Sequence, residues 1–256
     1  MPAPSEDGEG DKNEHGQPAS RRGAYNHEAH IEIIGQPSMY EGIDRLHVRD
    51  GGLTVIAPSM VYHPHHLSGS IVMIENMPDI LNGMDCLDLG CGTGIIALSM
   101  LARGARRVVA TDISERACAT TECNAILNAA KVRGRFPTVL CGDLFAPLVT
   151  LPKNDQRFDL IVFNMPLMNK APGPSDREQR AEESLCDQDG RLLTRFLDGV
   201  ARYIKPQGRA LFPHASISAP LPQDTLEASG ASVRVLIEQF LPGRMETFAL
   251  MEISFG

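Results

Sequence analysis

The chain has no tryptophan, and aromatic residues make up only 5% of its 256 positions. It also lacks an excess of basic residues, because the formal net charge is −8 at pH 7. Proteins that bind nucleic acid broadly need a basic face for the phosphates, and many add aromatic rings on which bases stack. We therefore expect a small-molecule substrate, with nucleic acid disfavoured as a partner. The composition leaves the oligomeric state open.

Long apolar runs and export signals are also missing. No apolar segment is long enough to span a membrane, and the N-terminus lacks a charged and then apolar export pattern. The sequence thus predicts a cytoplasmic protein without a membrane partner. No cysteine pair has Cys-x-x-Cys spacing, so we expect reduced thiols rather than a disulfide framework. The six cysteines are Cys86, Cys91, Cys118, Cys123, Cys141 and Cys186.

The composition divides the chain into three parts. Residues 1–23 are polar, with almost no apolar side chains, which predicts a disordered tail. Residues 24–70 include two short apolar runs within 46–57, joined at Asp50-Gly51-Gly52, which predict an N-terminal hairpin followed by a lid. Residues 71–256 contain enough apolar residues for the core of one main domain.

The most informative segment is CLDLGCGTG at positions 86–94. Its apolar start is typical of a buried parallel strand, and the apolar run at 95–102 predicts a helix. Gly90, Gly92 and Gly94 lie between them, where glycine lets the backbone approach a ligand closely. The alternative is a glycine-rich loop that does no more than reverse the chain.

A second apolar strand at 107–112 ends in Asp112, which lies 18 positions after Gly94. An acidic residue at this point in a nucleotide-binding fold accepts hydrogen bonds from ribose hydroxyls. The turn before it does not have the Gly-x-Gly-x-x-Gly spacing that binds a pyrophosphate. The pattern therefore favours a nucleoside-like ligand without phosphate.

These motifs resemble those of the class I S-adenosylmethionine-dependent methyltransferases, and the resemblance extends from about Leu81 to the C-terminus. It implies S-adenosylmethionine, as cofactor or as substrate, and no metal. The motif DLGCGTG at 88–94 matches the family's first motif. The residues that the resemblance places around the methionine part are Asp88, Gly90, Cys91, Gly92 and Gly94.

The resemblance also identifies residues for the rest of the cofactor. It assigns Asp112 to the ribose and Asp143, after a third strand at 138–141, to the adenine amino group. Ile113 and Leu144, which follow these two acids, join the same cofactor-binding set.

The fourth element is FDLIVFNMPL at 158–167. Its end resembles a variant of the Asn-Pro-Pro-Tyr signature found in the branch that contains release-factor glutamine methyltransferases. There the asparagine holds an acceptor nitrogen, so Asn164 and Pro166 are the catalytic candidates. Met165 replaces a proline, and Leu167 replaces the aromatic residue that would stack on a base. An asparagine and a proline that merely end a strand would leave the same pattern.

The remaining chain alternates helical and extended patterns. We expect helices at 68–82, 115–130 and 191–204, a strand at 209–213, and a terminal hairpin from strands at 232–240 and 246–254. The resemblance implies an α/β Rossmann-like fold. Its seven-stranded, mostly parallel sheet would end in a C-terminal antiparallel hairpin and would follow the N-terminal hairpin and lid.

The motifs lead to two functional hypotheses. In the first, the enzyme transfers a methyl group to a nitrogen of a small molecule or an amino-acid-like substrate. In the second, the amine of S-adenosylmethionine attacks its own γ-carbon, as in azetidine-2-carboxylate synthases, and releases methylthioadenosine. A protein that binds the cofactor without catalysis ranks third.

Three histidines, His63, His65 and His66, invite a metal hypothesis together with His214. No carboxylate or cysteine stands nearby at ligand spacing, so we expect no metal. In enzymes with the Asn-Pro-Pro-Tyr signature, a proline-containing stretch at this place covers the methionine end of the cofactor. Tyr62 or His65 would then line the pocket.

Overall fold

The computed structural model describes residues 42–46, 52–58, 61–62, 64, 69–169, 186–241 and 246–255. At residues 42–46, 241 and 246 it describes the backbone only. The predicted tail at 1–23 and much of the predicted lid lie outside these ranges, as do His63, His65 and His66.

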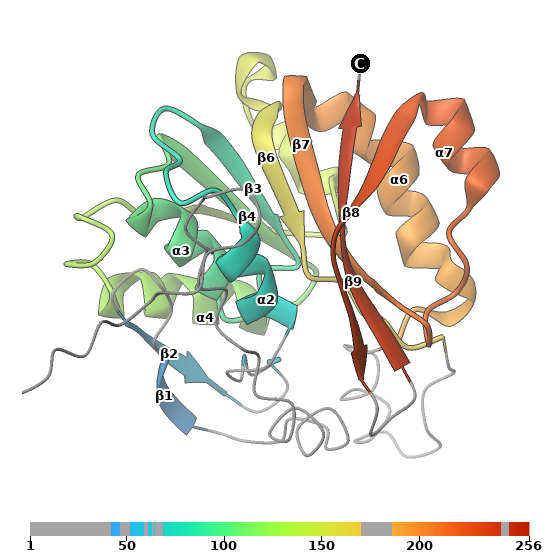
Figure 1. Cartoon of the computed structure of the whole chain (residues 1–256). Coiled ribbons are helices and arrows are strands. Elements are labelled where there is room, and N and C mark those ends of the chain that lie inside the picture. Colours follow the sequence, from blue (N-terminus) through green and yellow to red (C-terminus); the bar gives the residue numbers. More distant parts are fainter. Residues whose placement is uncertain are drawn as a thin grey trace, which may run out of the picture.

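Seven strands form one sheet in the order β5-β4-β3-β6-β7-β9-β8 (Figure 1). Strands β3 to β7 run parallel, whereas β9 pairs antiparallel with both β7 and β8. The predicted Rossmann-like methyltransferase fold and its C-terminal hairpin are thus confirmed. The strands are β3 (Asp85–Leu89), β4 (Arg107–Asp112), β5 (Thr138–Cys141), β6 (Phe158–Phe163), β7 (Ile204–Ala215), β8 (Ala231–Leu241) and β9 (Glu246–Phe255).

Helices cover both faces of this sheet. On one face lie α2 (Gly69–Asn76), α3 (Ile95–Ala102) and α4 (Glu115–Leu127). On the other lie η1 (Ala146–Thr150), α6 (Arg191–Tyr203) and α7 (Gln223–Ser229). Like η1, the shorter η2 (Lys153–Asp155) and η3 (Gln188–Gly190) are 3-10 helices. No helix in the described ranges has both the length and the apolarity needed to cross a membrane.

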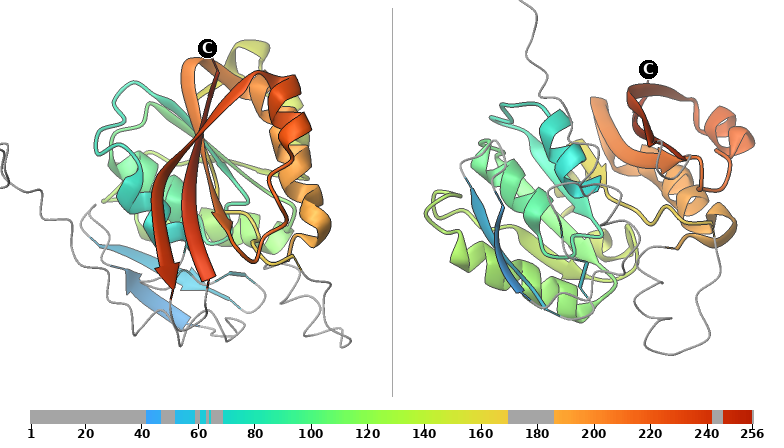
Figure 2. Two further views of the ribbon diagram at one scale, coloured as in Figure 1. Left: turned by 45° about the vertical axis from the view of Figure 1, so that its right-hand side comes forward. Right: turned by 60° about the horizontal axis from the view of Figure 1, so that its bottom comes forward.

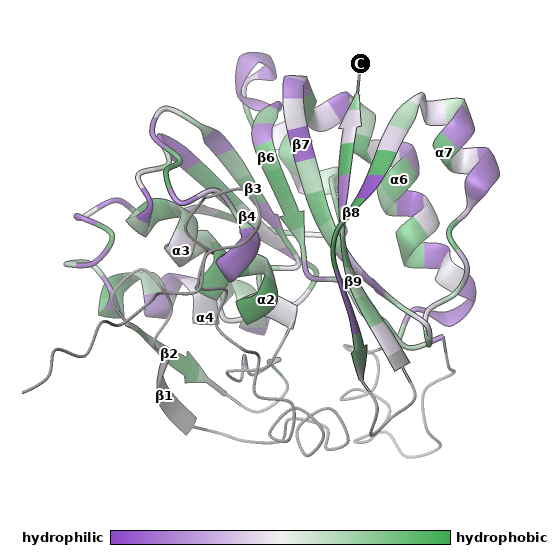
Figure 3. Ribbon diagram, in the orientation of Figure 1, coloured by the Kyte–Doolittle hydropathy of each residue, from purple (hydrophilic) through white to green (hydrophobic). Residues whose placement is uncertain are grey.

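The alternation of strand side chains creates two apolar cores. In β3, Cys86 packs among α2 and α3 residues, while Leu87 and Leu89 pack toward α6. Asp88 points to the same face as Cys86, because side chains two apart share a face of a strand. Figure 3 shows that apolar residues dominate the central strand β6.

The N-terminal hairpin consists of β1 (Gly42–Leu46) and β2 (Leu53–Ala57), paired antiparallel. It packs beside α4 and away from the main sheet (Figure 2). Asn128 donates to Thr54 O (2.7 Å) and accepts from Thr54 N (2.9 Å). Asn124 forms the same pair of bonds with Ile56. Because these asparagines are one helical turn apart, α4 pairs with β2 much as a neighbouring strand would.

Several predicted boundaries shift. The first strand of the hairpin was predicted to begin at Leu46, but it ends there, because Leu46 pairs with Leu53. The helix predicted at 68–82 ends at Asn76, shortly before Pro78, which disfavours helical backbone in the preceding residue. The strand predicted at 209–213 belongs to the longer β7, which gains partners on both sides from β6 and β9.

Candidate functional site

The glycine-rich loop links β3 to α3 at the carboxyl edge of the sheet. Gly90, Gly92 and Gly94 have φ values of 65°, 54° and 77°, which glycine adopts without strain. A Cβ at Gly94 would lie 2.7 Å from Thr121 Cγ2, so any larger residue would push α4 away. A Cβ at Gly92 would meet no described atom within 4 Å, so this part of the loop faces open space. Cys91 N donates to Thr111 O (2.9 Å) and ties the loop to β4.

Asp88 lies fully buried at the base of this loop. Its Oδ2 accepts a hydrogen bond from Ala97 N (3.0 Å) in the first turn of α3. Its Oδ1 is buried and has no hydrogen-bond partner among the residues that the structure describes. Burial raises the pKa of the Asp88 carboxyl to about 8. A buried carboxylate with an unused oxygen is suited to a cationic ligand group, which would compensate its charge.

Asp112 ends β4 and orders the loops on both sides of it. Its Oδ2 accepts from Gly92 N (2.9 Å) and its Oδ1 accepts from Ser114 N (2.9 Å). Burial raises the pKa of Asp112, although these hydrogen bonds oppose the shift. Each carboxylate oxygen has a second lone pair, so ribose hydroxyls can still donate to it. Ile113 follows with 73% of its surface exposed, which leaves an apolar surface at the site.

Asp143 and Leu144 lie just beyond the end of β5. Gly142 N donates to Asp112 O (2.8 Å), which brings this loop beside Asp112. Leu144 has a left-handed backbone with φ 47° and remains partly exposed. Asp143 forms an ion pair with Arg195 of α6. Sequence reasoning missed Arg195, because 52 positions separate it from Asp143 and its helical pattern gives no sign of the contact.

Asn164 follows β6, and the structure places it against the first turn of α2. Its Nδ2 donates to Ser70 Oγ (2.8 Å). Its Oδ1 lies above Gly69, where a Cβ would approach to 2.7 Å. Within the described ranges, no residue donates a hydrogen bond to that oxygen. Ser70, only 4% exposed, therefore fixes which end of the carboxamide is available. Sequence reasoning missed Ser70, since its only signal is that it opens a predicted helix.

The rest of the Asn164 motif packs against β7. Ser218 Oγ donates to Leu167 O (2.8 Å), so the motif's last carbonyl is already bonded. Met165 is buried, and Pro166 lines a small cavity with Met165, Leu167 and His214. His214 Nε2 lies 3.0 Å from Ala219 O, so this histidine has a structural contact.

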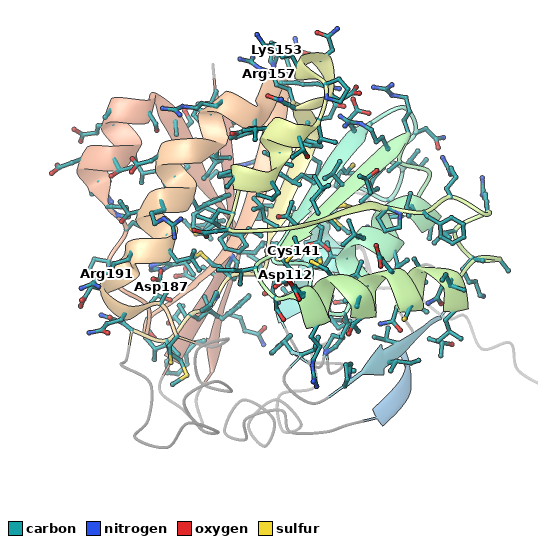
Figure 4. All side chains as sticks on the ribbon, turned by 180° about the vertical axis from the view of Figure 1, so that it is seen from behind. Asp112, Cys141, Lys153, Arg157, Asp187 and Arg191 are labelled. Atoms are coloured by element: carbon teal, nitrogen blue, oxygen red, sulfur yellow. The ribbon has the colours of Figure 1, made fainter. Side chains whose placement is uncertain are left out.

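The topology explains why these segments meet. Strands β5, β4, β3 and β6 are neighbours and parallel, so the loops after them share one edge of the sheet. Figure 4 shows Asp112 and Cys141 together at that edge, with Lys153 and Arg157 at the opposite edge. The unpartnered oxygen of Asp88, the open face of Gly92 and the exposed Ile113 fit S-adenosylmethionine, which combines an ammonium group with a nucleoside.

Comparison with known proteins agrees with this geometry. The model of the methyltransferase small domain family matches residues 52–208. The 16S rRNA N2-G1207 methyltransferase of T. thermophilus, solved with AdoMet and guanosine, has the same fold. Its TM-score is 0.61 at 17% identity, over 84% of this chain and 50% of that one. The family match identifies this chain as a methyltransferase, for which S-adenosylmethionine is the cofactor.

Three sequence relatives differ in their named substrates. A provisionally named protein N5-glutamine methyltransferase of Methanocaldococcus jannaschii is 29% identical over 58% of this chain and 68% of its own length. Ribosomal protein L11 methyltransferase of Azotobacter vinelandii is 36% identical over 55% of this chain and 42% of its own. The tRNA1(Val) (adenine(37)-N6)-methyltransferase of Porphyromonas gingivalis is 32% identical over 48% and 47%. The chain thus spans less than half of two of these relatives.

These names contradict the predicted partners. Small-molecule substrates were expected and nucleic acid was disfavoured, yet the relatives are named for proteins and tRNA. Net charge and aromatic content are averages over the whole chain, whereas a macromolecular substrate contacts one local surface. The family match covers more than half of the chain, and the fold agrees with it. This chain therefore belongs to the methyltransferase small domain family within the class I S-adenosylmethionine-dependent methyltransferases.

Proposed function

We propose that this enzyme methylates a planar side-chain nitrogen of a protein, of the kind carried by a glutamine carboxamide. The observation that carries the proposal is the orientation of Asn164. Its Nδ2 is occupied by Ser70 Oγ, which leaves Oδ1 as the acceptor for an N–H group. An acceptor held in this way presents its nitrogen in a fixed direction, and alignment is the main contribution that such a site makes to methyl transfer.

The other site residues would hold the cofactor. Asp88 and the loop containing Gly90, Cys91, Gly92 and Gly94 would enclose the methionine part. Asp112 would bind the ribose, with Ile113 and Leu144 against the adenine and Asp143 near its amino group. S-adenosylmethionine, when bound, supplies a methyl group activated by the sulfonium. The exposed Ile113 and the partly exposed Leu144 and Asp143 support this arrangement.

Two observations favour a protein amide as the acceptor. Relatives named for protein N5-glutamine and for ribosomal protein L11 both act on proteins by name. In this chain Leu167 stands where the signature has an aromatic ring, and a carboxamide needs no ring to stack on. Pro166, beside Asn164, would shape the loop so that a neighbouring main-chain carbonyl accepts the second N–H of the amide.

The test uses S-adenosylmethionine labelled in its methyl group. Purified enzyme is incubated with protein extract, with RNA, or alone, and the products are followed by chromatography. We expect label in protein, together with S-adenosylhomocysteine. Digestion with proteases, without acid hydrolysis, should recover the label as a methylated glutamine amide. Label in RNA instead would overturn the protein assignment. Methylthioadenosine formed without any acceptor would instead support intramolecular cyclisation of the cofactor.

Variants test the role of Asn164. Asn164→Ala is expected to lower kcat about 100-fold, because the acceptor loses its alignment, while cofactor affinity measured by calorimetry changes little. Ser70→Ala should lower kcat less, because the amide can then rotate. Asn154→Ala is the matched control, since Asn154 is exposed in η2 at the opposite edge of the sheet. Unchanged turnover in Asn164→Ala would contradict the proposal.

A further inference from the structure

Three cysteines from separate elements meet beside the predicted nucleoside site. Cys91 belongs to the glycine-rich loop, Cys118 to the first turns of α4, and Cys141 is the last residue of β5. The Cys118 side chain interacts with those of both Cys91 and Cys141. Cys118 Sγ also donates to Asp112 O (3.5 Å), and Cys141 Sγ donates to Ile113 O (3.7 Å). The sulfurs of Cys118 and Cys141 thus contact the carbonyls of two consecutive residues.

The three thiols differ in reactivity. The interaction with Cys91, assisted by that with Cys141, lowers the pKa of Cys118 to about 7, which increases its thiolate fraction near neutral pH. The thiolate is the form that reacts with oxidants. The pKa of Cys91 lies well above the ordinary value because of its interaction with Cys118 and its burial. Thr121 Oγ1 also holds the Cys91 sulfur at 3.2 Å. Cys141, in contrast, is exposed.

We propose that Cys118 and Cys141 form an oxidation site for hydrogen peroxide. The Cys118 sulfur attacks one peroxide oxygen, the O–O bond breaks, and a sulfenic acid and hydroxide result. The Cys141 thiol then attacks the sulfur of the sulfenic acid, forming a disulfide and releasing water. One peroxide is reduced while two thiols are oxidised. Cys141 is the resolving thiol because it is exposed and is not held by a residue like Thr121.

Such a disulfide would act on cofactor binding. It would join the end of β5 to α4 across the segment Asp112-Ile113, which contributes to the nucleoside site. Gly142 and Asp143 follow Cys141 directly, so their positions depend on it. Oxidation is therefore expected to weaken S-adenosylmethionine binding. By linkage, bound cofactor must disfavour the disulfide by the same factor.

The experiment treats the full chain with hydrogen peroxide and identifies disulfides by mass spectrometry of proteolytic peptides. Calorimetry then measures the affinity for S-adenosylmethionine. We expect a Cys118–Cys141 link, a Kd raised about fivefold or more, and recovery with dithiothreitol. Cys141→Ser should form no link and keep its affinity after peroxide. Cys123→Ser is the matched control, because Cys123 is an exposed cysteine of the same helix, and it should behave as the unmodified protein does.

Three results would overturn the proposal. They are the absence of a disulfide, a link from Cys118 to Cys91, and a Cys118–Cys141 link that leaves the Kd unchanged. Methyl transfer is not part of this readout, so failure here leaves the proposed function intact. A reduced protein that binds the cofactor but methylates no acceptor would sink the proposed function alone.

Discussion

At the residue scale, the sequence predicts the role of the buried Asp88, and the structure adds the contacts of its two oxygens. Its place in the motif at 88–94 predicts a role in cofactor binding. Only the structure shows that one oxygen bonds Ala97 N and that the other has no described partner. The same holds for Asn164, whose identity is visible in the sequence but whose orientation depends on Ser70, 94 positions away.

The raised pKa of Asp88 predicts a pH dependence of stability. The unfolded chain releases this proton near pH 3.9, whereas the folded protein holds it up to about pH 8. Stability therefore falls as pH rises through this window. Asp88→Asn keeps an acceptor for Ala97 N–H but cannot ionise, so we expect its Tm relative to wild type to rise between pH 5 and pH 8.

Thermal denaturation at both pH values checks this expectation. Asp224→Asn, at an exposed acid of α7, serves as the control and should show the same small Tm difference at both pH values. A Tm difference for Asp88→Asn that does not change with pH would mean that the folded protein does not raise the pKa of Asp88.

At the scale of elements, α4 connects the N-terminal hairpin to the glycine-rich loop. Asn124 and Asn128 each make two hydrogen bonds to the backbone of β2, at Ile56 and Thr54. Asn124 makes one more, from Nδ2 to Thr93 O (2.9 Å) in the glycine-rich loop. The sequence predicts the hairpin and the helix separately. It does not predict that two asparagine side chains join them.

Asn124 contacts Thr93 and Asn128 does not, so the two asparagines provide a matched pair of variants. Asn124→Ala and Asn128→Ala should each lower stability by about 2 kcal/mol, because buried backbone groups of β2 lose their partners. Asn124→Ala alone should also weaken S-adenosylmethionine binding, by about tenfold, since it releases the Thr93 carbonyl. Urea denaturation and calorimetry measure the two effects. Equal loss of cofactor affinity in both variants would show that the hairpin, and not the Thr93 contact, matters.

At the scale of the whole molecule, an ion-pair network closes the edge of the sheet opposite the site. Asp85 of β3 is buried, and Lys205 Nζ of β7 lies 2.7 Å from it and 2.8 Å from Asp159 of β6. Arg106 and Arg107 contact Asp85 from β4 and its preceding turn. Burial raises the pKa of Asp85, but the Lys205 hydrogen bond and these cations outweigh it and lower the pKa overall.

A lowered pKa means that this network stabilises the fold above the unfolded pKa, near 3.9, and that the stabilisation is lost as pH falls through the folded pKa. We expect Asp85→Asn to destabilise the protein by about 3 kcal/mol at pH 7, with a smaller difference from wild type at pH 3. Asp189→Asn, in the exposed pair with Arg191, should have little effect. Urea denaturation at both pH values measures the difference in unfolding free energy between Asp85→Asn and wild type. A difference that is larger at pH 3 than at pH 7 would contradict the expectation.

The cytoplasmic location, the disordered tail and the lid remain predictions from the sequence. The predicted partner, by contrast, is contradicted by relatives that are named for proteins and tRNA, because whole-chain charge and aromatic content do not describe one local surface. The succession of strands and helices along the chain follows from local apolar patterns and glycine placement, and so do the places of the glycine-rich loop, Asp112, Asp143 and Asn164 after strands. The Rossmann-like sheet was expected from the resemblance to the methyltransferases.

The tertiary structure decided what local patterns cannot contain. Ser70 meets Asn164, Arg195 meets Asp143, and Asn124 meets both β2 and Thr93 only after the sheet has brought distant segments together. The cysteines at 91, 118 and 141 look unrelated in the sequence, yet the structure gathers them at one edge. The sequence by itself determined the fold and the cofactor, because these depend on local motifs. The orientation of the Asn164 carboxamide and the surroundings of Cys118 depend on contacts across the chain, which only folding creates.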